Sequence, residues 1–187
     1  MECDTDILIG QYDSYKKILK KYFTDPGIDN FLEDFGTRLV TCPRGLTDED
    51  GGNYGDLVAF SSKVAIKAAE ISEGLCEKES AIRVALVHEI GKLGTLENEL
   101  FVEQESKCQR EKLGQNFKYA EDSQKMAVGH RTLFLLQQYK IVLSRDEWQT
   151  VLLSQGMHFP ENAFYGREKS ALTSVILFST DIVGKSV

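Results

Sequence analysis

Apolar residues recur at helical spacing along the N-terminal part of the chain. Two consecutive runs show this pattern: Tyr15, Ile18, Leu19 and Tyr22, then Phe31, Leu32, Phe35 and Leu39. Such spacing places the apolar side chains on one face of a helix and leaves the polar residues, many of them lysines in the first run, on the other face. The pattern predicts two amphipathic helices within residues 12–40, separated at Pro26-Gly27.

The same periodicity returns after residue 55 and continues almost to the end of the chain. It predicts further helices over five segments: 56–73, 78–93, 130–139, 144–156 and 170–183. The helix expected from Ser144 has a clear start, because Ser144 and Glu147 have the spacing of a capping box. With the N-terminal pair, these segments predict an all-α fold of about seven helices.

Three segments lack helical periodicity. Residues 41–56 are rich in turn formers, and we expect them to form a solvated loop over a pocket. Residues 157–169 are expected to form a polar, aromatic loop. In residues 95–128, Phe101-Val102 and 116–119 are expected to pair as a small β-hairpin around residues 100–119, with Lys112-Leu-Gly114 between its strands.

The chain shows no repeat and no linker long enough to separate domains. We therefore expect residues 1–187 to form a single domain, with the core in residues 55–183.

The composition is that of a globular protein and narrows the range of partners. Hydrophobic residues make up 42% of the chain, charged residues 27%, and the net charge is -7. This acidic balance argues against a nucleic acid partner, because phosphate backbones bind basic surfaces. No run approaches the ~20 apolar residues of a membrane helix, and the acidic start lacks the basic region of a signal peptide. Four scattered cysteines indicate reduced thiols. We expect a cytoplasmic protein without a membrane partner.

The candidate chemistry centres on one of the chain's three histidines. His88 lies within the apolar run of 78–93, and Glu89 follows it directly. Adjacent helix positions lie about 100° apart, so both side chains can lean toward one ion beside the helix. A buried Glu89 would need a cation or a metal, because an unpaired buried charge is expensive. The alternative is that Glu89 pairs at the protein surface with Lys92, three residues on.

The residues around this pair carry a family resemblance. Val84-Ala-Leu-Val-His-Glu-Ile-Gly-Lys-Leu-Gly94 resembles the ALLHDIGK(L/I)G segment of HD-domain metal phosphohydrolases, as in small phage and bacterial HD proteins. The late segment 172–181 resembles the family's L-x-x-x-(L/I)-x-x-A-D helix. The resemblance extends over about two-thirds of the chain and implies that His88, Glu89 and Asp181 are metal ligands. The alternative for Asp181 is an ordinary surface carboxylate.

Two positions depart from the HD pattern. Residues 55–64 resemble the helix that carries the family's first His ligand, but Phe60 stands at that position and cannot bind a metal. Glu89 replaces an Asp, which moves the carboxylate outward by one methylene. With fewer nitrogen ligands, Mg²⁺ or Mn²⁺ is easier to hold than zinc. A divalent metal (Mn²⁺, Mg²⁺, Co²⁺ or Zn²⁺) is therefore one expectation, and the absence of any metal is the other.

Two further histidines have candidate roles. His130 and Arg131 stand where the resemblance places a G-H-x-x-S-L helix start. There they are expected to bind a substrate phosphate, and His130 could instead join the metal site or simply face solvent. His158 is a further candidate metal ligand, although Gln155 competes for the same position.

Basic residues complete the candidate set. Lys92 shares a helix face with the His88-Glu89 pair, and the resemblance assigns both Glu89 and Lys92 a catalytic role. Lys112, on the expected hairpin, is a candidate for substrate binding, and Arg44 is a further candidate for binding an anion.

Two functions remain open at this point. The resemblance implies a phosphohydrolase that acts on a nucleotide or other small phosphoester through a metal-activated water. The alternative, favoured by Phe60, is a catalytically degenerate HD domain that binds a nucleotide or another protein. Either way, the expected partner is a small phosphorylated molecule or a protein rather than a nucleic acid strand.

Overall fold

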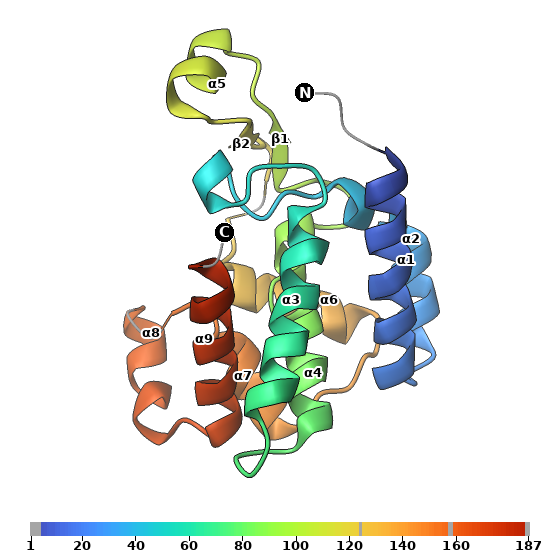
Figure 1. Cartoon of the computed structure of the whole chain (residues 1–187), viewed down its shortest axis with the longest axis vertical. Coiled ribbons are helices and arrows are strands. Elements are labelled where there is room, and N and C mark those ends of the chain that lie inside the picture. The colour runs from blue at the N-terminus through green and yellow to red at the C-terminus, as the bar shows by residue number, and fades with distance from the viewer. Residues whose placement is uncertain (1–4, 124, 157–158, 186–187) are drawn as a thin grey trace.

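The computed structural model describes residues 5–123, 125–156 and 159–185, and it is mostly helical with one small two-stranded sheet (Figure 1). The predicted all-α class with a small hairpin is therefore confirmed. The described helices include none that is long and apolar enough to cross a membrane.

The N-terminal half consists of helices joined by turns and one long loop. Its elements are α1 Thr5–Tyr22, α2 Gly27–Thr41, the 3-10 turn η1 Asp48–Asp50, α3 Asp56–Ile71, α4 Lys78–Val87 and the 3-10 turn η2 Ile90–Leu93. The C-terminal half begins with the hairpin and then returns to helices. Its elements are β1 Phe101–Glu103, α5 Lys107–Leu113, β2 Phe117–Tyr119, α6 Val128–Gln138, α7 Arg145–Leu153, α8 Pro160–Ala163, η3 Tyr165–Glu168 and α9 Ala171–Gly184.

Helices α3 and α4 form the centre of the molecule. From Ala81 to Val87, α4 carries buried apolar residues at almost every position, which is typical of a helix enclosed on all sides. It contacts α3, α1, α7 and α9, and Figure 1 shows α1 with α2 on one flank of this centre and α7 with α9 on the other. The hydroxyl of Tyr15 donates to the carbonyl of Leu86 over 2.7 Å and fixes α1 against the end of α4.

The predicted helix over 78–93 is wrong at its C-terminal end. Helix α4 stops at Val87, and His88 and Glu89 form the break before η2. The cause is the close approach of α6: the Thr132 hydroxyl lies 3.3 Å from the His88 carbonyl and accepts the Gly91 amide at 2.9 Å. A Cβ atom at position 91 would lie only 2.3 Å from the Val128 carbonyl oxygen, so only glycine allows this contact. Both candidate side chains at this break are buried.

The capping box predicted at Ser144 is confirmed. The Ser144 hydroxyl accepts the Glu147 amide, and the Glu147 carboxylate accepts the Ser144 amide at 2.8 Å. The segment 157–169, expected to be a polar, aromatic loop, contains the short helix α8 and the 3-10 turn η3 in its described part.

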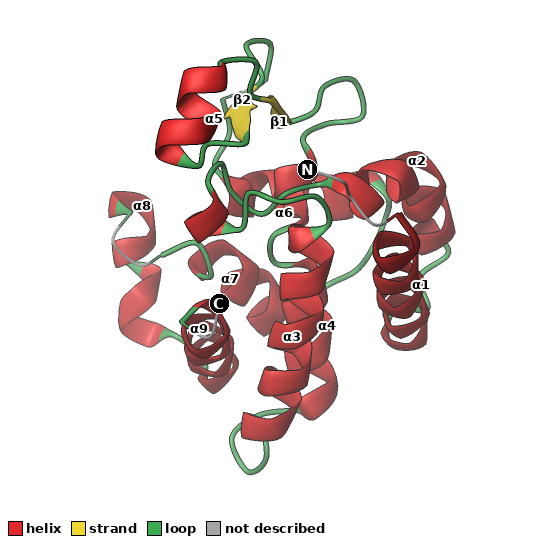
Figure 2. Ribbon diagram, turned by 45° about the horizontal axis from the view of Figure 1, so that its top comes forward, coloured by secondary structure: helices red, strands yellow, loops and turns green. Residues whose placement is uncertain are grey.

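The hairpin projects from one end of the helical body (Figure 2). Strands β1 and β2 pair antiparallel, which confirms the predicted hairpin, and their register places Phe101 opposite Tyr119. Residues 112–114 lie between the two strands, as expected, and form the end of the short helix α5 and its C-cap. The long loop 42–55 is tied to this hairpin: the Asn116 side-chain amide donates to Asp48 at 2.7 Å and to the Gly52 carbonyl at 3.0 Å. The loop and the hairpin therefore form one unit over the ends of α2 and α3.

Candidate functional site

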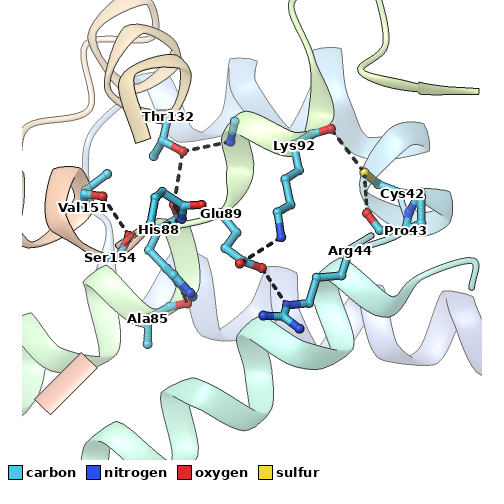
Figure 3. A network of polar contacts seen from close by, with 12 residues as sticks. Cys42, Pro43, Arg44, Ala85, His88, Glu89, Lys92, Thr132, Val151 and Ser154 are labelled. Carbon is cyan, nitrogen blue, oxygen red and sulfur yellow. Dashed lines mark hydrogen bonds and ion pairs between the residues drawn. The ribbon is translucent and has the colours of Figure 1, made fainter. Parts of the chain in front are cut away.

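The carboxylate of Glu89 lies inside the protein and is held by two cations. Its side chain is only 7% exposed. One oxygen accepts from the Arg44 Nε at 3.1 Å, and the other from the Lys92 Nζ at 2.9 Å (Figure 3). The sequence offers a Glu89–Lys92 pair at the protein surface as one alternative. The pair forms, but it lies inside the protein rather than at the surface. Arg44, Glu89 and Lys92 are called the ionic cluster below.

Arg44 owes its position to an aromatic ring. It stands in the loop after α2, and its guanidinium carbon lies 3.6 Å from the centre of the Phe60 ring on α3. The negative face of an aromatic ring attracts a cation, and the planar guanidinium stacks well on it. Phe60 therefore orients Arg44 toward Glu89 from the place where the HD resemblance expects a histidine ligand.

His88 lies beside the ionic cluster and is buried. Its Nδ1 is 2.8 Å from the Ala85 carbonyl, so this nitrogen carries the proton and donates it. The Nε2 then bears a lone pair, and it has no hydrogen-bond partner among the described residues. The ring centre lies 6.5 Å from that of Phe60.

Burial and charge set the ionisation of the site. Burial lowers the pKa of His88, which keeps the imidazole neutral. Burial acts to raise the pKa of Glu89, but the charges of Lys92 and Arg44 outweigh it and hold that pKa below its ordinary value. Burial also lowers the pKa of Lys92, against the attraction of Glu89. With both cations charged, the ionic cluster holds two positive charges and one negative charge.

The excess positive charge comes with unused hydrogen-bond donors. The Nη1 and Nη2 atoms of Arg44 donate to no described residue, and Lys92 uses one of its three ammonium protons on Glu89. The Arg44 side chain is 27% exposed and that of Lys92 is 14% exposed. An arrangement of this kind favours a bound anion, because buried charge is costly unless it is balanced.

The described donors do not fit a divalent metal. Both oxygens of Glu89 already accept from cations, and Phe60 supplies no ligand atom. Asp181 lies on α9 with 55% of its side chain exposed, and it pairs with Lys185 at 2.7 Å. Within the described residues, no group of three His, Cys, Asp or Glu side chains could hold a metal ion. His158 lies outside the described residues.

The predicted substrate-binding residues do not gather around the ionic cluster. Arg131 is buried, and its terminal nitrogens donate to the carbonyls of Gly91 and Met126 at 3.1 and 3.0 Å, which ties η2 to the start of α6. His130 is exposed in the first turn of α6, and Lys112 is exposed on α5.

The sequence predicts only part of the role of Arg44 in the ionic cluster. The sequence marked it as an anion-binding candidate, but its partner Glu89 lies 45 positions away. No local spacing connects two residues at that separation. The sequence indicates the position of Arg44 only indirectly. Phe60 stands where the HD resemblance places a histidine ligand, and its ring offers a surface on which a guanidinium can stack.

Lys92 also lies in the wall of a cavity of about 500 Å³. This cavity lies between the start of α1, the end of α2, η2 and the β-hairpin. Compared with models of known protein families, with curated proteins and with solved structures, the chain shows no match.

Proposed function

We propose that this chain is an HD-like domain that binds a small phosphorylated molecule without metal-dependent hydrolysis. The observation that carries the proposal is the buried ionic cluster, in which Arg44 and Lys92 share the single carboxylate of Glu89. The surplus positive charge and the unused donors match a phosphoryl group, which offers several acceptor oxygens and negative charge.

The place of Phe60 supports the degenerate HD interpretation. The resemblance assigns its position to a histidine ligand, and its ring does lie near that of His88. Arg44 stacks on the Phe60 ring, so a fixed protein cation lies beside Glu89, where the resemblance expects a metal. A protein cation can hold a phosphate and balance its charge, but it has no coordinated water to activate.

In this proposal each residue has a separate task. The Nη atoms of Arg44 offer two parallel donors, which suits two phosphate oxygens, and Lys92 contributes a third contact. Glu89 orients both cations and accepts from each of them. Neutral His88 has a lowered pKa and is a weak base, so it is poorly suited to removing a proton from water at neutral pH.

The metal-dependent phosphohydrolase is the second candidate, and one atom favours it. The Nε2 of His88 has a buried lone pair without a described partner, which is what a metal-binding imidazole offers. One nitrogen is too few ligands for a catalytic metal, because such sites use about three protein ligands.

A binding and activity assay separates the two candidates. The purified protein is analysed for metal, offered Mn²⁺, Mg²⁺, Co²⁺ and Zn²⁺, and assayed on phosphomonoesters and phosphodiesters. Titration calorimetry with inorganic phosphate and with nucleotides is run in parallel. We expect no stoichiometric metal, no turnover and measurable phosphate binding.

Two variants locate the binding. Arg44→Met should weaken phosphate binding about tenfold, the loss of one charge-assisted contact. Lys112→Met removes an exposed cation elsewhere and should leave binding unchanged. Stoichiometric metal together with turnover that His88→Ala abolishes would overturn the proposal.

A further inference from the structure

The cavity beside Lys92 has an apolar wall and a lid. The β-hairpin covers it with Phe101, Val102 and Phe117, and the opposite wall includes Leu8 and Val40 from α1 and α2. Its volume of about 500 Å³ falls within the range of roughly 300–1,000 Å³ of small-molecule sites. Surrounded by such side chains, an apolar body of similar size would be removed from water, which is favourable.

The polar side chains in this wall are already engaged. Arg38 donates to the backbone carbonyls of Thr95 and Leu96, the latter at 2.9 Å, and its Nε pairs with Glu99 at 3.5 Å. The Tyr54 hydroxyl donates to Glu103. These groups therefore offer few free polar contacts to a ligand, and the cavity presents mainly hydrocarbon and ring surfaces.

Lys92 is the exception, because it links the cavity to the ionic cluster. It lines the cavity and its ammonium group pairs with Glu89 alone among the described residues. Cys42, another wall residue, is neutral at physiological pH because burial raises the pKa of its thiol to about 12. A ligand in the cavity would therefore meet the positive charge of Lys92 and mainly apolar surface, beside the carboxylates of Glu99 and Glu103, which are paired with Arg38 and Tyr54.

We infer that the cavity under the β-hairpin binds the apolar or aromatic body of an anion whose charged group reaches Lys92. For the anionic end of the ligand, this inference rests on the proposed function. For the rest of the ligand, it adds an apolar or aromatic body. The preferred ligand is thus an amphiphilic anion with one compact charged group rather than a free phosphate.

Two matched dyes test this chemistry. Anilinonaphthalene sulfonate has an aryl body with one negative charge, and phenylnaphthylamine has the same kind of body without the charge. Each is titrated by fluorescence against the folded full-length protein, whose native state is checked by near-UV circular dichroism. We expect saturable binding of both dyes at one site, with the sulfonate bound more tightly and losing affinity as salt is added.

Variants assign the site. Val102 is half-buried in the lid, and Val102→Trp should fill the cavity and weaken both dyes about tenfold. Thr5→Trp, at an exposed position of the same wall, is the substitute if Val102→Trp does not fold. The control is Val142→Trp in a separate groove of about 330 Å³ between α6 and α7, which should change neither affinity. Lys92→Met should weaken the sulfonate about tenfold and the neutral dye less than about twofold.

The outcomes separate this inference from the proposed function. Unchanged dye binding in both Val102→Trp and Thr5→Trp would overturn the cavity assignment. An equal effect of Lys92→Met on the two dyes, or a salt-independent sulfonate affinity, would overturn the anionic end. Phosphate binding should persist in Val102→Trp, so loss of the dye with retained phosphate supports the inference. If Arg44→Met leaves phosphate binding unchanged, this result contradicts the proposed function alone. The cavity assignment is then still tested by binding of the neutral dye.

Discussion

Two arginine–glutamate pairs among the described residues share the same construction, in which a partly exposed arginine holds a buried carboxylate. Arg83 donates through Nε to Glu147 at 2.8 Å, and its guanidinium lies 4.3 Å from the centre of the Phe23 ring. Arg44 donates through Nε to Glu89 at 3.1 Å and lies over Phe60.

The difference lies in the terminal nitrogens of the two arginines. Those of Arg83 donate to the carbonyls of Tyr22 and Val142 at 2.8 and 2.7 Å, which joins α4 to the end of α1 and to the loop between α6 and α7. Those of Arg44 donate to no residue in the described part of the chain. The same pairing is therefore structural when every guanidinium nitrogen donates within the protein, and suited to a ligand when both terminal nitrogens remain available.

The largest expected effect is the loss of stability when Arg83 is removed. Arg83→Met should lower the free energy of unfolding by about 3 kcal/mol, because Glu147 would stay buried without its cation. Arg44→Met should cost only about 1 kcal/mol, since Lys92 still pairs with Glu89. Urea unfolding followed by circular dichroism measures both. Equal losses would contradict the distinction between the two pairs.

Removing the carboxylate of the ionic cluster should have an intermediate, pH-dependent effect. Glu89→Gln leaves Lys92 and the partly exposed Arg44 without their counter-charge and should cost about 2 kcal/mol near neutral pH. Because the folded-state pKa of Glu89 lies below its ordinary value of 4.5, this stabilisation is complete above that pH. It is lost as the pH falls through the folded-state pKa.

The measurement is the unfolding free energy of wild type and Glu89→Gln in phosphate-free buffer from pH 7 downward. The two curves should converge below pH 4.5. A difference that stays constant over this range would show that Glu89 is not stabilised as a carboxylate.

The aromatic platforms should differ in what they support. Phe60→Leu and Phe23→Leu should each lower the unfolding free energy by about 1 kcal/mol through lost packing and cation–π attraction. Only Phe60→Leu should also weaken phosphate binding, by about threefold, because Arg44 loses its orientation. Calorimetry on the two variants checks this, and equal phosphate affinities would argue against a role for Phe60 in the site.

The smallest effects are expected at the exposed candidates named from the sequence. Lys112→Met, His130→Ala and Asp181→Asn change exposed side chains that form no hydrogen bond or ion pair with the ionic cluster. None should measurably alter stability or phosphate affinity. A marked loss of phosphate affinity in any one of these variants would show that the residue contributes to phosphate binding.

The sequence predicted the elements whose signals are local. The capping box at Ser144, the helix from Asp56 and the pairing of Phe101 with the 116–119 strand were readable because periodicity and caps act over a few residues. The end of α4 was missed because it depends on α6, where Thr132 meets Gly91 across 41 positions. Tertiary contacts of this kind override helix propensity.

The candidate site was predictable to the same limited extent. His88, Glu89 and Lys92 stand within five residues of one another, so their proximity was expected. Arg44 reaches Glu89 from a distant loop, and the direction of Asp181 depends on which face of α9 packs inward. The chemistry of the site therefore depends on contacts that no local pattern records.

Phosphate bound at Arg44 should stabilise the folded protein, and this stabilisation should depend on Arg44 but not on Arg83. Unfolding free energies of wild type, Arg44→Met and Arg83→Lys are measured against phosphate concentration, with chloride at equal ionic strength as the reference. Binding to the folded state raises stability by mass action, so wild type and Arg83→Lys should be stabilised in parallel despite their different starting values. Arg44→Met should show little or no phosphate-dependent gain. The same gain in all three proteins, or none in wild type, would contradict a phosphate site at Arg44.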